Sequence, residues 1–143
     1  ILNPAPARKI DEENFKLIDF FTPNETEAEF YLNKKIKTES DIKNAGQELL
    51  KKGVKNVIIT LGAKGVYFAN KEKNFFLNAF ELKEPVLDTT GAGDAFNGAL
   101  TVSLASNLDI KEALIFANKI AGISTTKLGA AASMPFTKDL VNY

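Results

Sequence analysis

The chain has 143 residues, of which 45% are hydrophobic and 25% are charged, and these proportions fit a globular domain able to bury a core. Its 18 basic and 18 acidic residues leave no net charge, so there is no general basic excess for nucleic acid. Because Cys and His are absent, disulfides, thiolate or imidazole zinc sites, cysteine nucleophiles and Ser-His-Asp triads are excluded. No apolar run reaches the roughly 18 residues of a membrane span, so we expect neither a nucleic acid nor a membrane as partner.

The chain does not begin with Met, because its only Met is Met134. Its first residues are the apolar pair Ile1 and Leu2, followed by Asn3 and Pro4. This pattern is typical of a buried strand that ends in a turn. We therefore expect the chain to be a piece of a longer protein or a cleaved product; the alternative is a removed tag or initiator.

In the first half of the chain, short apolar runs alternate with helical patterns. Residues 17–21 form a compact apolar run that Thr22-Pro23-Asn24 ends, which is typical of a buried strand before a tight turn. Ser40 is the expected N-cap of a later helix and Gly53 its C′ residue. The expected elements are a strand at 1–3, a helical stretch at 11–16, a strand at 17–21, a helix at 26–32 and a helix up to 52.

The second half begins with the clearest strand signal, the β-branched run 57–61. A glycine-bounded turn follows at 62–65, and residues 70–74 form a polar hairpin tip. Asp109 is the expected N-cap of the last long helix. The other expected elements are strands at 66–68, 75–77 and 80–82, helices at 94–106 and up to 127, a small-residue loop at 128–135 and a helical tail.

This order contains two strand–helix–strand units, which predict an α/β fold with a mostly parallel sheet in a three-layer α/β/α arrangement. Crossovers between parallel strands are expected to be right-handed. Ligands gather at the carboxyl ends of the strands in such sheets. Here those ends carry Asn24, the loop 62–65 and the loop 88–94.

The polar loop 88–94 carries the strongest chemical signal. Gly91 and Gly93 allow close backbone approach, and the helix that follows offers free N–H groups and its positive dipole end to an anion. Such a cradle suits a transferring phosphoryl group, although it is not a Walker A loop, because Gly-Lys-Ser/Thr is missing. Asp94 stands where the anion would bind and has two interpretations: a helix acid that stabilises the dipole, or a general base for a substrate hydroxyl.

The segment Asp88-Thr-Thr-Gly-Ala-Gly-Asp94-Ala-Phe-Asn-Gly resembles the second signature of the ribokinase-like (pfkB) carbohydrate kinases. Five further segments fall in the order and approximate spacing of that family: 3–7 (NPAPA), 22–28 (TPNETEA), 60–65 (TLGAKG), 116–118 (FAN) and 129–133 (GAAAS). The resemblance covers nearly the whole chain and implies the C-terminal portion of a ribokinase-like fold.

The resemblance implies an ATP-dependent sugar kinase that phosphorylates the 5-hydroxyl of D-ribose to give ribose 5-phosphate. Asp94 is then the catalytic base and also binds the sugar, while Gly91, Ala92 and Gly93 form the anion hole. The alternatives are another sugar kinase of the family, such as a fructokinase-like enzyme, or a nucleotide-binding fragment without turnover. A homodimer in the cytoplasm is expected for the complete protein.

The resemblance also implies a nucleotide site. Asn24 is expected to contact the phosphates of ATP and Glu27 to organise Mg²⁺ through water; the alternative is a turn Asn beside a solvated acid. For Lys64 and Asn118, a solvated lysine and an ordinary helix residue are the alternatives. The expected ATP-binding residues are Asn24, Thr60, Leu61, Gly62, Ala63, Lys64, Gly65, Gly93, Asp94 and Asn118.

A potassium ion beside the anion hole is the last feature that the resemblance implies. It is expected to order the loop 91–94 rather than to touch substrate, and Asp88 is expected to neutralise it in part. Alternatively, Asp88 only forms a turn. The matching positions are Asp88, Thr90, Ser124, Lys127, Gly129 and Ser133.

The N-terminal half of the family pattern has no counterpart in this chain. That half carries the sugar-binding residues, a Gly-Gly motif and a small β-sheet lid. We therefore expect residues 1–143 to form the C-terminal, nucleotide-binding part of a ribokinase-like domain, without the sugar-binding half and the lid.

Overall fold

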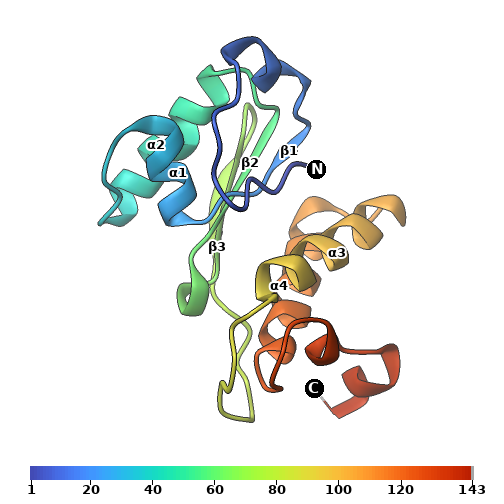
Figure 1. The fold of residues 1–143 in the computed structure, drawn as a ribbon. Helices are drawn as coiled ribbons and strands as arrows, with labels where there is room; N and C mark the ends of the chain where they lie inside the picture. The colour runs from blue at the N-terminus through green and yellow to red at the C-terminus, as the bar shows by residue number, and fades with distance from the viewer. Residues whose placement is uncertain (143) are drawn as a thin grey trace. The chain divides into compact units, whose positions relative to one another are not determined.

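The computed structural model describes residues 1–142, which divide into two compact units. The first unit extends from Ile1 to Asn78, and the second begins at Ala79. A β-sheet organises the first unit, and a pair of α-helices organises the second (Figure 1). Among the described residues, no helix combines the length and the apolar character that crossing a membrane requires.

The sheet of the first unit is mixed. β1 pairs with β2 in parallel, whereas β2–β3 and β3–β4 are antiparallel pairs. The α/β class is confirmed, but this sheet is not mostly parallel, because the connection at residues 61–65 is too short for a crossover between parallel strands. In sheet order, the strands are β1 (Phe20–Phe21), β2 (Asn56–Thr60), β3 (Val66–Asn70) and β4 (Asn74–Leu77).

Two helices of this unit, α1 (Glu25–Leu32) and α2 (Glu39–Lys51), each begin with a capping box. The N-cap of α2 is Thr38 rather than the expected Ser40, because Asp41 accepts the Thr38 N–H at 2.9 Å in return for the Thr38 cap. Gly53 follows α2 with a φ of 113°, as expected for a residue that ends a helix.

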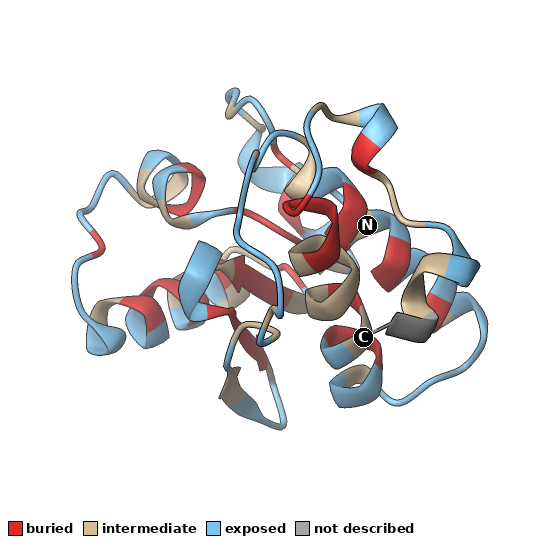
Figure 2. Ribbon diagram, turned by 90° about the horizontal axis from the view of Figure 1, so that it is seen from below, coloured by how far each residue is buried: buried red, intermediate tan, exposed pale blue. Residues whose placement is uncertain are grey.

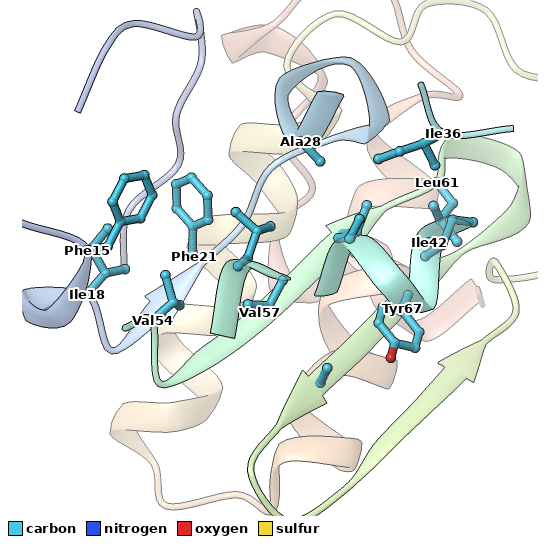
Figure 3. Close-up of a cluster of buried hydrophobic side chains, with 14 residues drawn as sticks. Phe15, Ile18, Phe21, Ala28, Ile36, Ile42, Val54, Val57, Leu61 and Tyr67 are labelled. Carbon is cyan, nitrogen blue, oxygen red and sulfur yellow. The ribbon is translucent and has the colours of Figure 1, made fainter. Parts of the chain in front are cut away.

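The hydrophobic core of the first unit lies between these helices and one face of the sheet (Figure 3). Val57 of β2 and Tyr67 of β3 pack there with Leu49 of α2, and Phe15 closes the cluster in edge-to-face contact with Phe21. Buried residues are accordingly concentrated on the strands and along one side of each helix (Figure 2).

Three predicted strands differ from the structure. The strand predicted at 17–21 is shorter in the structure: a 3-10 helix spans Glu12–Leu17, and β1 contains only Phe20 and Phe21 of the predicted strand. Instead of a strand at 1–3, Leu2 forms one parallel bridge with Phe21. Residues 80–82 form no strand; instead, the side chains of Phe80 and Leu82 lie beside Gly122 of the second unit.

The second unit contains α3 (Ala92–Ala105) and α4 (Ile110–Ser124), which pack along each other. Asp109 is the N-cap of α4 as predicted, and its Oδ1 accepts the Lys111 N–H at 2.8 Å. α3 begins two residues before the prediction and α4 ends three residues before it. Short 3-10 helices follow at Ala131–Ser133 and Thr137–Asn142; the last residue of the predicted helical tail, Tyr143, lies outside the described residues.

Candidate functional site

The carboxyl ends of β1 and β2 lie side by side, as parallel pairing requires. The Thr60 N–H donates to the Pro23 carbonyl at 3.0 Å, and Asn24 forms a parallel bridge with Thr60. Asn24 and the loop that follows Thr60 therefore lie at one edge of the sheet, as the sequence predicted for Asn24 and the loop 62–65.

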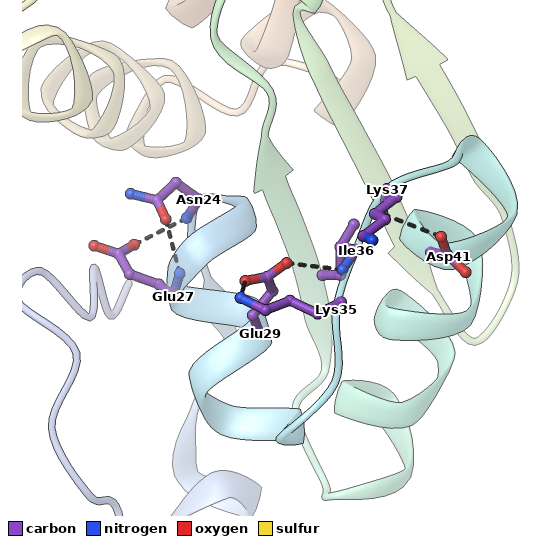
Figure 4. Close-up of polar contacts among 7 residues, drawn as sticks. All are labelled: Asn24, Glu27, Glu29, Lys35, Ile36, Lys37 and Asp41. Atoms are coloured by element: carbon purple, nitrogen blue, oxygen red, sulfur yellow. Dashed lines mark hydrogen bonds and ion pairs between the residues drawn. The ribbon is translucent and has the colours of Figure 1, made fainter.

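Asn24 and Glu27 hold each other through the capping box of α1 (Figure 4). The Asn24 Oδ1 accepts the Glu27 N–H at 2.8 Å, and the Glu27 Oε2 accepts the Asn24 N–H at 2.9 Å. These bonds use one polar atom of each side chain. The Asn24 Nδ2 and the Glu27 Oε1 have no partner among residues 1–142, so a donor and an anionic oxygen stay available at the end of β1.

The glycine-bounded loop after β2 is a tight 3-10 turn over Gly62–Lys64. Gly62 and Gly65 both have positive φ, 57° and 97°, and the Leu61 N–H donates to the Gly65 carbonyl at 2.8 Å. Leu61 is buried, whereas Gly62, Ala63 and Lys64 are exposed. Within the described chain the Lys64 ammonium forms no ion pair, so it is available to a ligand or to solvent alike.

In the second unit, the Asp88 carboxylate joins two loops. Its Oδ1 accepts the Thr90 N–H and its Oδ2 accepts the Gly129 N–H, both at 2.9 Å. The Thr90 side chain, its N–H and the Gly129 N–H together hold the pKa of Asp88 below its ordinary value. The Asp88 side chain thus stabilises the turn at Thr90 and also links this turn to the loop at Gly129.

Gly91 is the N-cap of α3 and has a φ of 81°. The Ala95 N–H donates to the Gly91 carbonyl at 2.9 Å, and the Ala92 N–H donates to the Thr89 carbonyl at 3.2 Å. The N–H groups of Gly93 and Asp94 have no acceptor in the described part of the chain. The two amides lie at the positive end of the helix dipole, where the anion cradle was expected. Of the three residues expected to form the anion hole, Ala92 already donates its N–H to Thr89, and anion binding by this turn stays a prediction.

Asp94 is the third residue of α3 and is exposed. Its carboxylate forms no hydrogen bond or ion pair with any other residue among 1–142. An acid in the first turn that only stabilises the helix dipole needs no local N–H either, so both interpretations of Asp94 fit this geometry and its role as a base stays a prediction.

Comparisons with known proteins identify the family of this chain. A model of the pfkB family carbohydrate kinases matches residues 1–137. The chain belongs to this family. A ribokinase of Haemophilus influenzae is 39% identical over 143 residues, covering all of this chain and 46% of that protein. The chain therefore spans about half the length of the curated relatives it matches.

Solved structures give the same likeness. A ribokinase of Thermotoga maritima has a TM-score of 0.86 and 40% identity, covering 98% of this chain and 46% of that protein. A ribokinase of Arabidopsis thaliana, complexed with ribose and ATP, has a TM-score of 0.87 and 34% identity, covering 93% of this chain and 43% of that one. The ribokinase-like fold is thus shown for this pfkB chain.

The positions expected to hold potassium in this pfkB chain share the second unit but are not all in contact. Asp88, Thr90 and Gly129 form one hydrogen-bonded group. The hydroxyls of the buried Ser124 and Ser133 donate to the carbonyls of Ala121 and Ala130 instead. Lys127 lies 3.5 Å from Asp139 and is exposed. Within residues 1–142, no three carboxylates gather into a metal-binding cluster.

Asn118 lies on α4 and is half-buried, with interactions of its own to other residues. Its expected contact with the nucleotide stays a prediction.

Sequence reasoning missed Thr125. Its buried carbonyl accepts the N–H groups of Leu87 at 2.8 Å and Asp88 at 3.2 Å, and so it fixes the segment that leads to Gly91. No local pattern marks Thr125, because the contact joins segments far apart in the chain. Its neighbourhood was indicated by the expected potassium positions Ser124 and Lys127 and by the small-residue loop that follows.

Proposed function

We propose that the complete protein is an ATP-dependent kinase that phosphorylates the 5-hydroxyl of D-ribose, and that this chain is its nucleotide-binding part. The ribokinases among its relatives and the family match support this assignment. The observation that carries it is the unpaired Asp94 carboxylate beside the unpaired N–H groups of Gly93 and Asp94. A base and an anion cradle within one helical turn suit phosphoryl transfer to an alcohol.

In this mechanism Asp94 accepts the proton of the ribose 5-hydroxyl. The hydroxyl oxygen then forms its bond to the γ-phosphorus of ATP while the bond to the ADP oxygen breaks. The amides at the start of α3 stabilise the negative charge on the transferring group. The products are ribose 5-phosphate and ADP, with the proton left on the Asp94 carboxyl.

The first unit would bind the phosphates. The free Nδ2 of Asn24 is a suitable donor to a phosphate oxygen, and the exposed loop Gly62–Lys64 offers backbone and ammonium groups. The capping box fixes the Asn24 side chain in advance, so little side-chain entropy is lost when the nucleotide binds.

Two cations fit the residues present. The free Glu27 oxygen suits a water-mediated Mg²⁺, which would neutralise phosphate charge when bound. The oxygen-rich group around Asp88, Thr90 and Gly129 suits K⁺, and these residues would thereby hold the loop that carries Gly91.

The rest of the assignment concerns the complete protein. We propose that the sugar-selecting residues and the lid lie outside this chain, since the chain covers 46% of its ribokinase relative. The homodimer and the cytoplasmic location expected for the complete protein stay predictions.

A sugar panel tests the proposal. The complete protein is incubated with ATP, Mg²⁺, K⁺ and either D-ribose, 2-deoxy-D-ribose or D-fructose; ADP release is measured, and phosphorus NMR locates the new ester. We expect the highest kcat/KM for ribose and the phosphate on the 5-oxygen. Preference for fructose would replace the ribose assignment with a fructokinase-like one, and no turnover with any sugar would contradict a kinase.

The same assay on this chain alone, and on this chain mixed with the other half of the protein, separates an enzyme part from an inert nucleotide-binding module. We expect turnover only in the mixture. No turnover in the mixture, with the complete protein active, would show that the two halves do not reassemble.

A further inference from the structure

The glycine that begins α3 is in contact with a distant loop. Gly91 has a φ of 81°, and a Cβ built on it would lie 3.1 Å from both Cα and Cβ of Ala130 and 3.3 Å from Cε of Met134. Ordinary contacts of a Cβ lie at 3.4–4 Å, so Ala130 lies too close to Gly91 for a side chain to fit there without a shift of a few tenths of an ångström. By contrast, a Cβ on Gly93 would meet nothing within 4 Å.

Ala130 is itself held in place from two sides. The Gly129 N–H donates to the Asp88 carboxylate at 2.9 Å, which ties the loop to the segment that precedes Gly91. On the other side, the Ser133 hydroxyl donates to the Ala130 carbonyl at 2.7 Å, and Ser133 is fully buried. Ala130 therefore lies between two hydrogen bonds that tie its loop to neighbouring residues.

The position of Gly91 determines where the next N–H groups point. Gly91 is the N-cap, so its dihedral angles set the axis of the first turn that carries the amides of Gly93 and Asp94. A group that presses on Gly91 moves this turn, and small misplacements at a reacting centre cause large losses of rate.

We propose that Ala130 is a positioning residue for phosphoryl transfer. Its methyl group packs against Gly91 and holds the backbone there in place. The first turn of α3 can then present its amides and the Asp94 carboxylate to the reacting phosphate. This inference rests on the proposed function and adds a residue to it. Ala130 touches neither substrate in this account and acts through Gly91 alone.

The test compares Ala130→Val with Ala131→Val in the complete protein. Ala131 stands in the same loop but is exposed, so it is a matched control for the added bulk. We expect Ala130→Val to lower kcat at least about tenfold while the KM for ATP and the melting temperature change little, and Ala131→Val to leave kcat within about twofold. A kcat for Ala130→Val equal to that of Ala131→Val overturns the proposal.

A second pair of variants covers the case in which Ala130→Val does not fold. Gly91→Ala is expected to lose nearly all turnover, because of its positive φ and its contacts with Ala130 and Met134. The double variant Gly91→Ala/Ala130→Gly should recover at least about threefold, because it removes one of the groups that the new Cβ meets, the Ala130 methyl. If the effects of Gly91→Ala and Ala130→Gly on kcat simply add in the double variant, the contact between the two residues does not cause the loss of turnover, and the proposal is overturned. If the unaltered protein phosphorylates no sugar, the proposed function fails first; if it is active and the variants at 130 behave like those at 131, this inference alone fails.

Discussion

Asp88 and Gly129, which are 41 positions apart in the chain, are joined by a 2.9 Å hydrogen bond from the Gly129 N–H to the Asp88 carboxylate. The other carboxylate oxygen accepts the Thr90 N–H, so one side chain connects the loop before α3 with the loop after α4. The loop that leads into α3 is therefore held by a contact that is remote in sequence.

The first prediction concerns potassium. Replacing Asp88 by Ala removes the charge expected to balance K⁺ and the link to Gly129, so turnover of the complete protein should lose its stimulation by KCl over NaCl. Asp19→Ala is the control, since Asp19 is an exposed carboxylate of the first unit paired with Lys55. An unchanged potassium response of Asp88→Ala would rule out this site.

The second prediction concerns pH. Hydrogen bonds from Thr90 and Gly129 hold the pKa of Asp88 below its ordinary value of 3.8. A carboxyl with a lowered pKa stabilises the fold above the unfolded-state pKa, and this contribution disappears as the pH falls through the folded-state pKa. Urea unfolding should therefore show Asp88→Asn to be less stable at about pH 6 and the difference to shrink below about pH 4. A difference that is the same at both pH values would contradict this account of Asp88.

The third prediction separates the two roles of Asn24. Asn24→Ala removes the cap of α1 and should cost about 1 kcal/mol of unfolding free energy together with nucleotide affinity. Asn24→Asp keeps the capping oxygen but loses the Nδ2 donor, so it should retain the stability and still bind ATP more weakly. Thr38→Ala, which breaks the corresponding cap of α2, should lower stability alone. Calorimetric titration with ATP measures the affinity; normal binding by Asn24→Asp would remove Asn24 from the phosphate site.

The fourth prediction concerns Ser103 on α3. Its hydroxyl is buried, and no partner for its Oγ exists among the described residues. Ser103→Ala should therefore raise the unfolding free energy by about 1 kcal/mol, because an unsatisfied buried group is removed. Thr126→Val is the control: it removes a buried hydroxyl that donates to the Ile123 carbonyl at 2.8 Å, and it should not stabilise. A loss of stability in Ser103→Ala would mean that the hydroxyl has a partner in solution.

Local signals explain which elements were predictable. The start of α4 follows from Asp109, and the end of α2 follows from Gly53, because each cap is satisfied by its own neighbours. The sequence also contained the signal for the Thr38 cap, since Asp41 stands three residues later, but Ser40 competed with it. The antiparallel β2–β3 pair was likewise readable from the short connection at 61–65.

Tertiary contacts explain the rest. Residues 80–82 have the composition of a strand, yet they form none, and the side chains of Phe80 and Leu82 lie beside Gly122. In the same way, the motif at 88–94 marked Asp94 and Gly91, whereas no pattern marked Thr125, and the segment 129–133 did not indicate that Ala130 lies beside Gly91. Such supporting residues emerge only when the fold brings distant segments together.

The most direct test of the central claim is the turnover of Asp94→Asn in the complete protein, with Glu112→Gln as control. Glu112 is also an exposed acid in the first turn of a helix, so its replacement reports any effect of the helix dipole alone. If Asp94 is the base, Asp94→Asn should lower kcat at least about 100-fold and leave ATP affinity within a few-fold, while Glu112→Gln stays near the unaltered rate. Near-normal kcat in Asp94→Asn would contradict the account.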